Sequence, residues 1–287
     1  MIPPTFEYHA PRSLGEAVEL LTSMNGDAKL LAGGHSLLPM MKMRFAQPGV
    51  LIDIHRIPEL RGISEADGQI RIGAMTTESE LISSVLLKQE LPLVPEAALL
   101  IADPQVRNRG TIGGDIAHGD PGNDHPAIAM ALDATFVLQG PKGERQVKAV
   151  EFFHGTYMTE LAEDEILTAI LVSSFAAGTG YAYQKLKRKT GDWATAGAAV
   201  VLRMNGGRVT EARIGLTNVA PTALRARDAE AALIGQSLTD ATLDAVVKAV
   251  RGVCDPAEDL RGNVEYKTAM AAEMTRRAIR VAAARCH

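Results

Sequence analysis

Two short glycine-centred segments have the composition of loops that bind phosphate groups. They are Ala32-Gly33-Gly34-His35-Ser36 and Thr111-Ile112-Gly113-Gly114-Asp115. Glycine lets the backbone approach a ligand closely and permits turns in which several N–H groups point into one concavity. Ser36 and Thr111 would each add a hydroxyl donor. The pair of loops predicts a nucleotide-type ligand with phosphate bound between them.

Either segment alone is more typical of a tight turn than of a phosphate-binding loop. Neither matches the G-x-G-x-x-G dinucleotide pattern or the G-x-x-x-x-G-K-[ST] phosphate loop. The hypothesis therefore depends on finding two such segments, each bordered by a hydroxyl residue, and the tight-turn interpretation stays open.

Other polar residues favour structural roles. His118 and His125 lie near Asp115, Asp120 and Asp124, but the chain has no helical H-x-x-x-H or H-E-x-x-H pair. We expect these carboxylates to cap helices and turns, so no metal site is predicted. Ser36 has no evident partner base for a hydrolase triad.

A basic run, Lys185 to Lys189, precedes Trp193, the only tryptophan. The run is typical of a solvated strand face. Trp193 lies in a polar turn, where it would either stack on a flat ring or cover a joint between domains.

The elements that must position these residues follow from hydrophobic periodicity and turn signals. An amphipathic helix begins after Ser13, and a small α/β lobe continues with a strand at 29–32, a helix at 37–43 and a strand at 50–54. Hairpins are predicted around 66–68 and 140–143, helices at 76–84 and 94–101, and a strand at 166–172.

The glycine-rich stretch 175–180 is a candidate domain joint. Beyond it we predict three antiparallel strands (181–186, 196–204, 208–218) and three helices (226–234, 239–253, 266–285). This is an α+β arrangement of two domains, 1–177 (subdomains about 1–56 and 57–177) and 178–287.

Composition excludes several classes of protein. The 46% hydrophobic and 22% charged residues indicate an ordinary globular chain, and a net charge of −4 disfavours an electrostatic nucleic-acid binder. Cys254 and Cys286 are too few for a disulfide framework or a four-thiolate iron–sulfur cluster. No signal peptide or membrane-spanning segment is evident, so we expect a cytoplasmic protein.

The glycine-centred segments resemble the two FAD-binding signatures of the flavoprotein subunits of molybdenum hydroxylases, the family that includes the flavin part of xanthine dehydrogenase. The similarity covers essentially the whole chain. The stretches 32–42, 103–110, 115–124 and 187–193 resemble most closely the branch that serves aerobic molybdenum–copper carbon monoxide dehydrogenases. The resemblance implies an FAD domain of the vanillyl-alcohol-oxidase type with two α/β subdomains, followed by a smaller domain with a three-stranded antiparallel sheet and helices.

The resemblance also implies which residues bind the cofactor. Residues 30–37 and 111–115 would wrap the diphosphate, Asp124 would contact the flavin nucleotide, Ile101 and Leu167 would lie beside the isoalloxazine, and Lys185 would lie near the flavin. The implied set is Leu30, Ala32, Gly33, Gly34, His35, Ser36, Leu37, Ile101, Thr111, Ile112, Gly113, Gly114, Asp115, Asp124, Leu167, Lys185 and Trp193. No catalytic residue and no metal ligand is expected in this chain. Relatives that reduce NAD have a different charged loop where this chain has Lys187 to Trp193, which favours another electron acceptor.

The implied function is electron transfer in an assembly. FAD in this chain would receive electrons from [2Fe–2S] clusters of a small subunit, after CO becomes CO2 at a molybdenum–copper centre of a large subunit, and would pass them to a quinone or respiratory acceptor. A dimer of heterotrimers is expected, in the cytoplasm or attached to the inner face of its membrane. The alternatives are the flavin subunit of a hydroxylase for aldehydes, purines or aromatic thioesters, an assembly scaffold, and a stand-alone reductase, for which no NAD(P)H site is evident.

Overall fold

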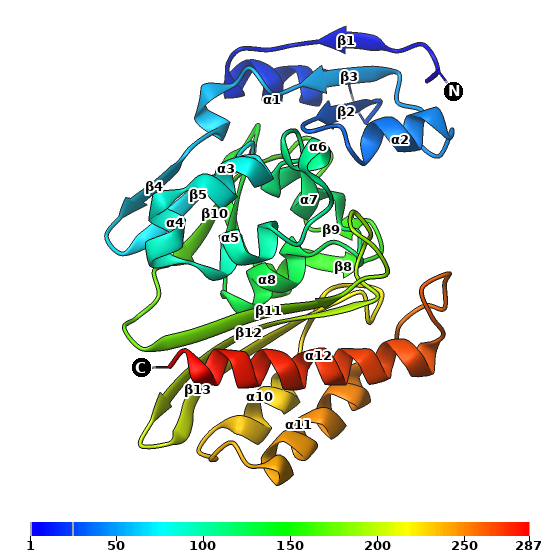
Figure 1. Ribbon diagram of the computed structural model, residues 1–287. Coiled ribbons are helices and arrows are strands. Elements are labelled where there is room, and N and C mark those ends of the chain that lie inside the picture. Colours follow the sequence, from blue (N-terminus) through cyan, green and yellow to red (C-terminus); the bar gives the residue numbers. More distant parts are fainter. Residues whose placement is uncertain (1, 25, 287) are drawn as a thin grey trace.

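The fold consists of three main sheets, each with its own covering helices, stacked along the molecule, and a small two-stranded sheet (Figure 1). The computed structural model describes residues 2–24 and 26–286. The prediction of a mixed helix and strand architecture is confirmed. None of the helices among these residues combines the length and apolar character needed to cross a bilayer.

The first lobe contains a three-stranded parallel sheet in the order β1-β3-β2. Its elements are β1 (Glu7–His9), α1 (Leu14–Ser23), β2 (Ala28–Leu31), α2 (Leu37–Lys42), β3 (Val50–Asp53) and a 3-10 turn (Pro58–Leu60). Ser13 caps α1 by accepting a hydrogen bond from the Glu16 backbone N–H at 3.3 Å, as its sequence signal predicts. The parallel order places the carboxyl end of β2, where the first glycine-centred segment begins, at one edge of the lobe.

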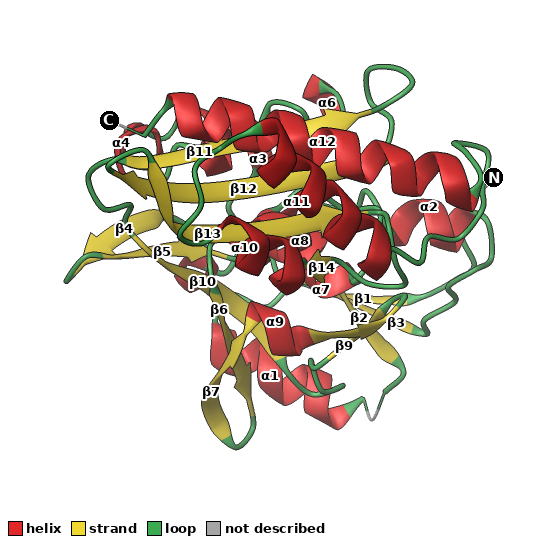
Figure 2. Cartoon of the chain, turned by 90° about the horizontal axis from the view of Figure 1, so that it is seen from below, coloured by secondary structure: helices red, strands yellow, loops and turns green. Residues whose placement is uncertain are grey.

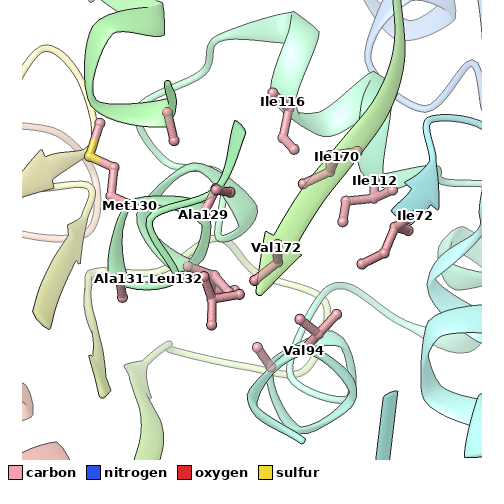
Figure 3. Close-up of a cluster of buried hydrophobic side chains, with 14 of the residues drawn as sticks. Ile72, Val94, Ile112, Ile116, Ala129, Met130, Ala131, Leu132, Ile170 and Val172 are labelled. Carbon is pink, nitrogen blue, oxygen red and sulfur yellow. The ribbon is translucent and has the colours of Figure 1, made fainter. Parts of the chain in front are cut away.

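The middle part has a five-stranded antiparallel sheet in the order β4-β5-β10-β6-β7. Its strands are β4 (Ile63–Ala66), β5 (Gln69–Gly73), β6 (Thr135–Gly140), β7 (Gly143–Lys148) and β10 (Ile166–Ser173), with a small separate pair, β8 (Phe153–Gly155) and β9 (Met158–Thr159). Its helices are α3 (Glu78–Ser83), α4 (Val85–Glu90), α5 (Leu93–Ala98), α6 (Pro104–Arg107), α7 (Ile112–His118), α8 (His125–Ala131) and α9 (Ala149–Phe152). Figure 3 shows Ile112 and Ile116 of α7 gathered with Ile72 and Ile170 of the sheet, so this core fixes the second glycine-centred segment.

The C-terminal part has a four-stranded antiparallel sheet in the order β11-β12-β13-β14, where three strands were predicted. Its elements are β11 (Thr179–Leu186), β12 (Ala196–Asn205), β13 (Arg208–Thr217), β14 (Leu224–Arg225), α10 (Arg227–Leu233), α11 (Asp240–Val253) and α12 (Val264–Ala284). The additional strand pairs with β13 only through Gly215 with Arg225 and Leu216 with Leu224. Two residues are too short for an alternating pattern, so the sequence carries no signal for it. Helices α10, α11 and α12 lie over one face of this sheet (Figure 2), and α5 and α8 of the middle part contact it as well.

Candidate functional site

The first glycine-centred segment presents a row of backbone N–H groups without protein acceptors. It connects β2 to α2, and Gly34 has φ +79°, a left-handed conformation that favours glycine. Within residues 2–24 and 26–286, no hydrogen-bond acceptor takes the N–H groups of Gly33 through Leu37, whereas the next residue, Leu38, donates to the Gly34 carbonyl at 3.2 Å. The Ser36 hydroxyl makes no capping bond. Such a run of adjacent donors is suited to a phosphate group.

We expected the second glycine-centred segment to offer free N–H groups to a phosphate, as the first one does, but it does not. Its N–H groups are already used: Ile112 donates to Thr76 O at 3.1 Å, Gly113 to Ala74 O at 2.9 Å, and Asp115 to Thr111 O at 3.0 Å. The Gly114 N–H donates to the Thr111 hydroxyl at 3.2 Å, which caps α7. The prediction that both loops offer free amides is wrong for this one, because the segment is the first turn of a helix bound to the end of β5.

The two glycine-centred segments nevertheless meet. A Cβ built on Gly33 would lie 2.3 Å from the Arg109 carbonyl oxygen and 2.9 Å from the Gly110 Cα, so the backbones touch where only glycine fits. A Cβ built on Gly114 would lie 3.4 Å from the Cβ of Ala32. The second segment therefore forms a wall beside the free N–H groups of the first.

Asp124 lies at the start of α8 and joins the middle part to strand β11. Its Oδ2 accepts a hydrogen bond from Lys185 Nζ at 2.7 Å, and its Oδ1 accepts one from the Tyr183 hydroxyl. The Lys185 and Asp124 side chains are only 1% and 6% exposed. Burial and the neighbouring Asp124 hold the pKa of Tyr183 well above its usual value. This arrangement fixes a buried cation whose charge is shared with one carboxylate.

A second buried pair links α3 to α8. The His125 Nε2 lies 2.9 Å from each carboxylate oxygen of Glu78. Burial opposes the charge on His125, but Glu78, helped by Asp115 and Asp124, outweighs it and raises the His125 pKa to about 9. Burial raises the pKa of Asp115 to about 7, against the attraction of His125. The Asp115 Oδ2 is buried with no hydrogen-bond partner in the described part of the chain.

Three further predicted residues, Ile101, Leu167 and Trp193, lie next to residues that contact the elements described above. Lys187 Nζ donates to the Leu100 carbonyl at 2.9 Å, next to Ile101, and burial with nearby Lys185 lowers the pKa of Lys187. Leu167 is buried in β10, where Thr168 O accepts the Ala74 N–H that adjoins the second glycine-centred segment. The Trp193 side chain is half exposed and packs against Gly122, where the C-terminal part contacts the middle part. Stacking on a flat ring and covering a domain joint both stay predictions for this residue.

The structure adds residues that sequence reasoning missed. Strand alternation places Tyr183 on the same face as Lys185, a signal that was available in the pattern. Glu78 has no such signal, because its partner His125 is 47 residues away. His118, considered earlier as a metal ligand, packs its ring 4.9 Å from that of Tyr157. Among the residues that the structure describes, no group of three or more His, Cys, Asp or Glu side chains has the arrangement of a metal site.

Comparison with known proteins adds independent findings. A family model described as the FAD binding domain in molybdopterin dehydrogenase matches residues 4–173, and one described as the CO dehydrogenase flavoprotein C-terminal domain matches residues 181–282. The chain is 63% identical over 286 residues to the carbon monoxide dehydrogenase medium chain of Hydrogenophaga pseudoflava, covering 100% of both chains. It is 51% identical over 285 residues to the corresponding medium chain of Afipia carboxidovorans, covering 99% of both. A solved structure of carbon monoxide dehydrogenase from Hydrogenophaga pseudoflava, lacking the Mo-pyranopterin moiety of its molybdenum cofactor, superposes with a TM-score of 0.99 at 66% identity over 100% of both chains.

Proposed function

Because the chain belongs to the family of FAD-binding subunits of molybdopterin dehydrogenases, we propose that it is the electron-transferring flavoprotein subunit of an aerobic molybdenum–copper carbon monoxide dehydrogenase. The observation that carries the cofactor assignment is the run of free N–H groups from Gly33 to Leu37, walled by the second glycine-centred segment. The higher identity to carbon monoxide dehydrogenase medium chains, 63% and 51% against 37% for the medium subunit of a nicotine 6-hydroxylase, supports this enzyme over other molybdenum hydroxylases.

The residues fit FAD. The diphosphate would be held by the N–H groups of 33–37 with the hydroxyl of Ser36, and the flavin part would extend toward Asp124, Ile101 and Leu167. When bound, FAD supplies the exchange between single electrons and electron pairs. In this chain the remaining members of the proposed binding set are Leu30, Ala32, His35, Thr111, Ile112, Gly113, Gly114, Asp115, Lys185 and Trp193.

Lys185 would tune the cofactor electrostatically. Its ammonium group is held in place by Asp124 and lies within 3.4 Å of the Leu100 carbonyl oxygen, so it is fixed before any ligand enters. A fixed cation in a low-dielectric site stabilises negative charge on a neighbouring ring more strongly than a mobile surface lysine does. The chain's own contribution is therefore to bind, orient and bias the flavin, and no residue here contacts CO.

The partners are a large molybdenum-containing subunit and a small iron–sulfur subunit. Two such heterotrimers would form a dimer, and a quinone or respiratory carrier would accept the electrons, since the family resemblance of the 187–193 segment implies an acceptor other than NAD. We propose a cytoplasmic assembly, because Cys254 and Cys286 are both free thiols, as is typical of a reducing compartment; attachment to the inner face of the membrane is the alternative location. The domain boundary would lie at 177/178, within the gap between the two family matches.

The decisive experiment is co-purification of this chain with its partners, followed by analysis for flavin, iron, molybdenum and copper. Equimolar FAD together with copper at the molybdenum site supports the proposal. FAD and molybdenum without copper would instead indicate a hydroxylase of another substrate, and an assembled chain without flavin would indicate a scaffold.

A further inference from the structure

The segment that connects β11 to β12 brings Trp193 against the loop before α8. A Cβ built on Gly122 would lie 3.1 Å from Trp193 Cδ1, so the indole packs directly on that glycine. Gly122 is two residues from Asp124, which binds Lys185. The Trp193 ring is 51% exposed, so packing on one side alone does not hold it. Its position must be set by the residues that anchor the segment.

Asp192 is the anchor of this segment. Its side chain is 5% exposed and receives two guanidinium groups. The Oδ1 atom accepts from Arg261 Nη2 at 2.8 Å and from Arg261 Nε at 3.2 Å, while Oδ2 accepts from Arg188 Nε at 2.9 Å. Burial disfavours the charged carboxylate, but these hydrogen bonds outweigh it and lower the pKa of Asp192. The carboxylate thus links the segment to the loop between α11 and α12.

Arg261 is itself held rigidly. Its backbone N–H donates to Asp259 Oδ1 at 2.8 Å, and its Nη1 lies 3.3 Å from Asp259 Oδ2. Asp259 also accepts from the buried Lys267 Nζ at 3.0 Å. The guanidinium carbon of Arg261 lies 5.6 Å from the centre of the Trp193 ring, within range of a cation–π contact. One side chain therefore contacts both the anchor and the indole.

We propose that Arg261 is a positioning residue that holds Trp193 against Gly122 by gripping Asp192, and that it thereby keeps the indole as a cover at the edge of the flavin site. Arginine is required because it donates two N–H groups to one carboxylate oxygen and presents a flat face to the ring, which lysine cannot do. The covering role rests on the proposed function, whereas the grip on Trp193 does not.

Since Trp193 is the only tryptophan, its fluorescence reports its position without any cofactor. In the full-length, flavin-free chain, Arg261→Gln and Asp192→Asn should raise acrylamide quenching of Trp193 by up to about twofold, since the ring now exposes 51% of its surface and release would expose the rest. Arg261→Lys should give an intermediate value. Unchanged quenching in Arg261→Gln would overturn the proposal.

A control variant distinguishes a loss of Trp193 positioning from a general loss of protein stability. Arg285 also combines an ion pair, 2.8 Å to Glu96, with a guanidinium 4.5 Å from an aromatic ring, that of Tyr181. Arg285→Gln should lower the melting temperature without changing Trp193 quenching. If it raises quenching as much as Arg261→Gln does, the effect is general loosening and the proposal fails.

The covering role is tested in the flavin-loaded complex. Arg261→Gln should make the flavin more accessible to iodide quenching and quicken FAD release, with Arg285→Gln as the control. A quenching change in the flavin-free chain with no change in the loaded complex would retain the grip and overturn the cover. A chain that binds no FAD at all would overturn the proposed function and with it the cover, but not the grip.

Discussion

Lys185 and Asp124 form an ion pair of 2.7 Å between strand β11 and the start of helix α8, almost fully shielded from solvent. The same carboxylate accepts the hydroxyl of Tyr183, two residues before Lys185 on the strand. Breaking such a pair leaves an uncompensated charge, whereas the intact pair contributes little net stability. Under the proposed function, the role of the pair is to fix a cation beside the flavin.

Replacing Lys185 should change both the cofactor potential and the stability. In the assembled, FAD-containing complex, Lys185→Met removes a cation that favours the reduced, more negative flavin, so the two-electron potential should fall by roughly 20–45 mV, corresponding to about 1–2 kcal/mol. The unpaired Asp124 should also lower the free energy of unfolding by about 3 kcal/mol. Spectroelectrochemical titration and denaturant unfolding measure the two effects.

The control for this change is Lys187→Met. The Lys187 ammonium donates to the Leu100 carbonyl and forms no ion pair with a carboxylate within residues 2–24 and 26–286, so its loss should move the potential less. Adding Asp124→Asn to Lys185→Met should recover stability without restoring the potential. A Lys185→Met complex with the parental potential would remove Lys185 from flavin tuning.

Part of this site could be predicted from the sequence. The flavin family and the candidate residues 32–36, 111–115, Asp124 and Lys185 came from the resemblance of local motifs, and the family is confirmed by the full-length matches. The partner of Lys185 could not be predicted, because 61 residues separate it from Asp124 and nothing local specifies which carboxylate it meets. Long-range pairs of this kind follow from tertiary packing rather than from sequence pattern.

The glycine-centred segments show the same limit. Their composition predicted close backbone approach, and the Gly33 contact with Arg109 is such an approach, but to protein backbone. Composition could not reveal that the N–H groups of 112–115 are used by α7 and the end of β5. Helix α7 is seven residues long, too short for a clear periodic signal.

Gly33→Ala should separate the two segments. A Cβ at 2.3 Å from the Arg109 carbonyl forces the backbones apart, which we expect to cost about 1–3 kcal/mol of stability. The displaced N–H groups should also weaken FAD binding by about tenfold or more, for a loss of at least about 1.4 kcal/mol. Denaturant unfolding and flavin titration of the apo chain measure these effects.

Gly15→Ala serves as the opposite control. Gly15 lies in α1 with nothing within 4 Å of a built Cβ, so alanine should stabilise the helix by about 0.5–1 kcal/mol and leave FAD binding unchanged. If Gly33→Ala behaves like Gly15→Ala, the close approach of the two segments is not needed for the site.

The buried pair of His125 and Glu78 should make stability depend on pH. The folded-state pKa of His125 is raised to about 9, against an unfolded value of about 6.5. The charged His125 therefore contributes on the order of 3 kcal/mol to the free energy of unfolding below pH 6.5, and this contribution is lost as the pH rises to 9. Glu78→Gln should destabilise the chain at pH 6.5 and flatten the fall in melting temperature between pH 6.5 and 9.

An exposed pair of the same type provides the comparison. His154 lies 2.8 Å from Glu160, but both side chains are exposed. His154→Asn should leave the slope of melting temperature against pH as it is in the parent. A Glu78→Gln variant with the parental slope would show that His125 is not the group responsible.

Asp115→Asn should stabilise the protein at alkaline pH. Burial raises the pKa of Asp115 to about 7, so between about pH 4 and pH 7 the folded chain retains a proton that the unfolded chain has lost, and stability falls as the pH rises through that window. Asparagine has nearly the shape of the protonated acid and does not titrate. The variant should therefore match the parent near pH 4 and exceed its free energy of unfolding by about 2–4 kcal/mol at pH 8. Asp67→Asn, at an exposed turn with φ +54°, should give no such difference.

The Asp115→Asn variant should also bind FAD more tightly than the parent above pH 7, because an ionised Asp115 beside the diphosphate loop repels phosphate. If the free energies of unfolding of parent and variant change in parallel from pH 4 to pH 8, Asp115 is ionised throughout that range and the prediction is contradicted.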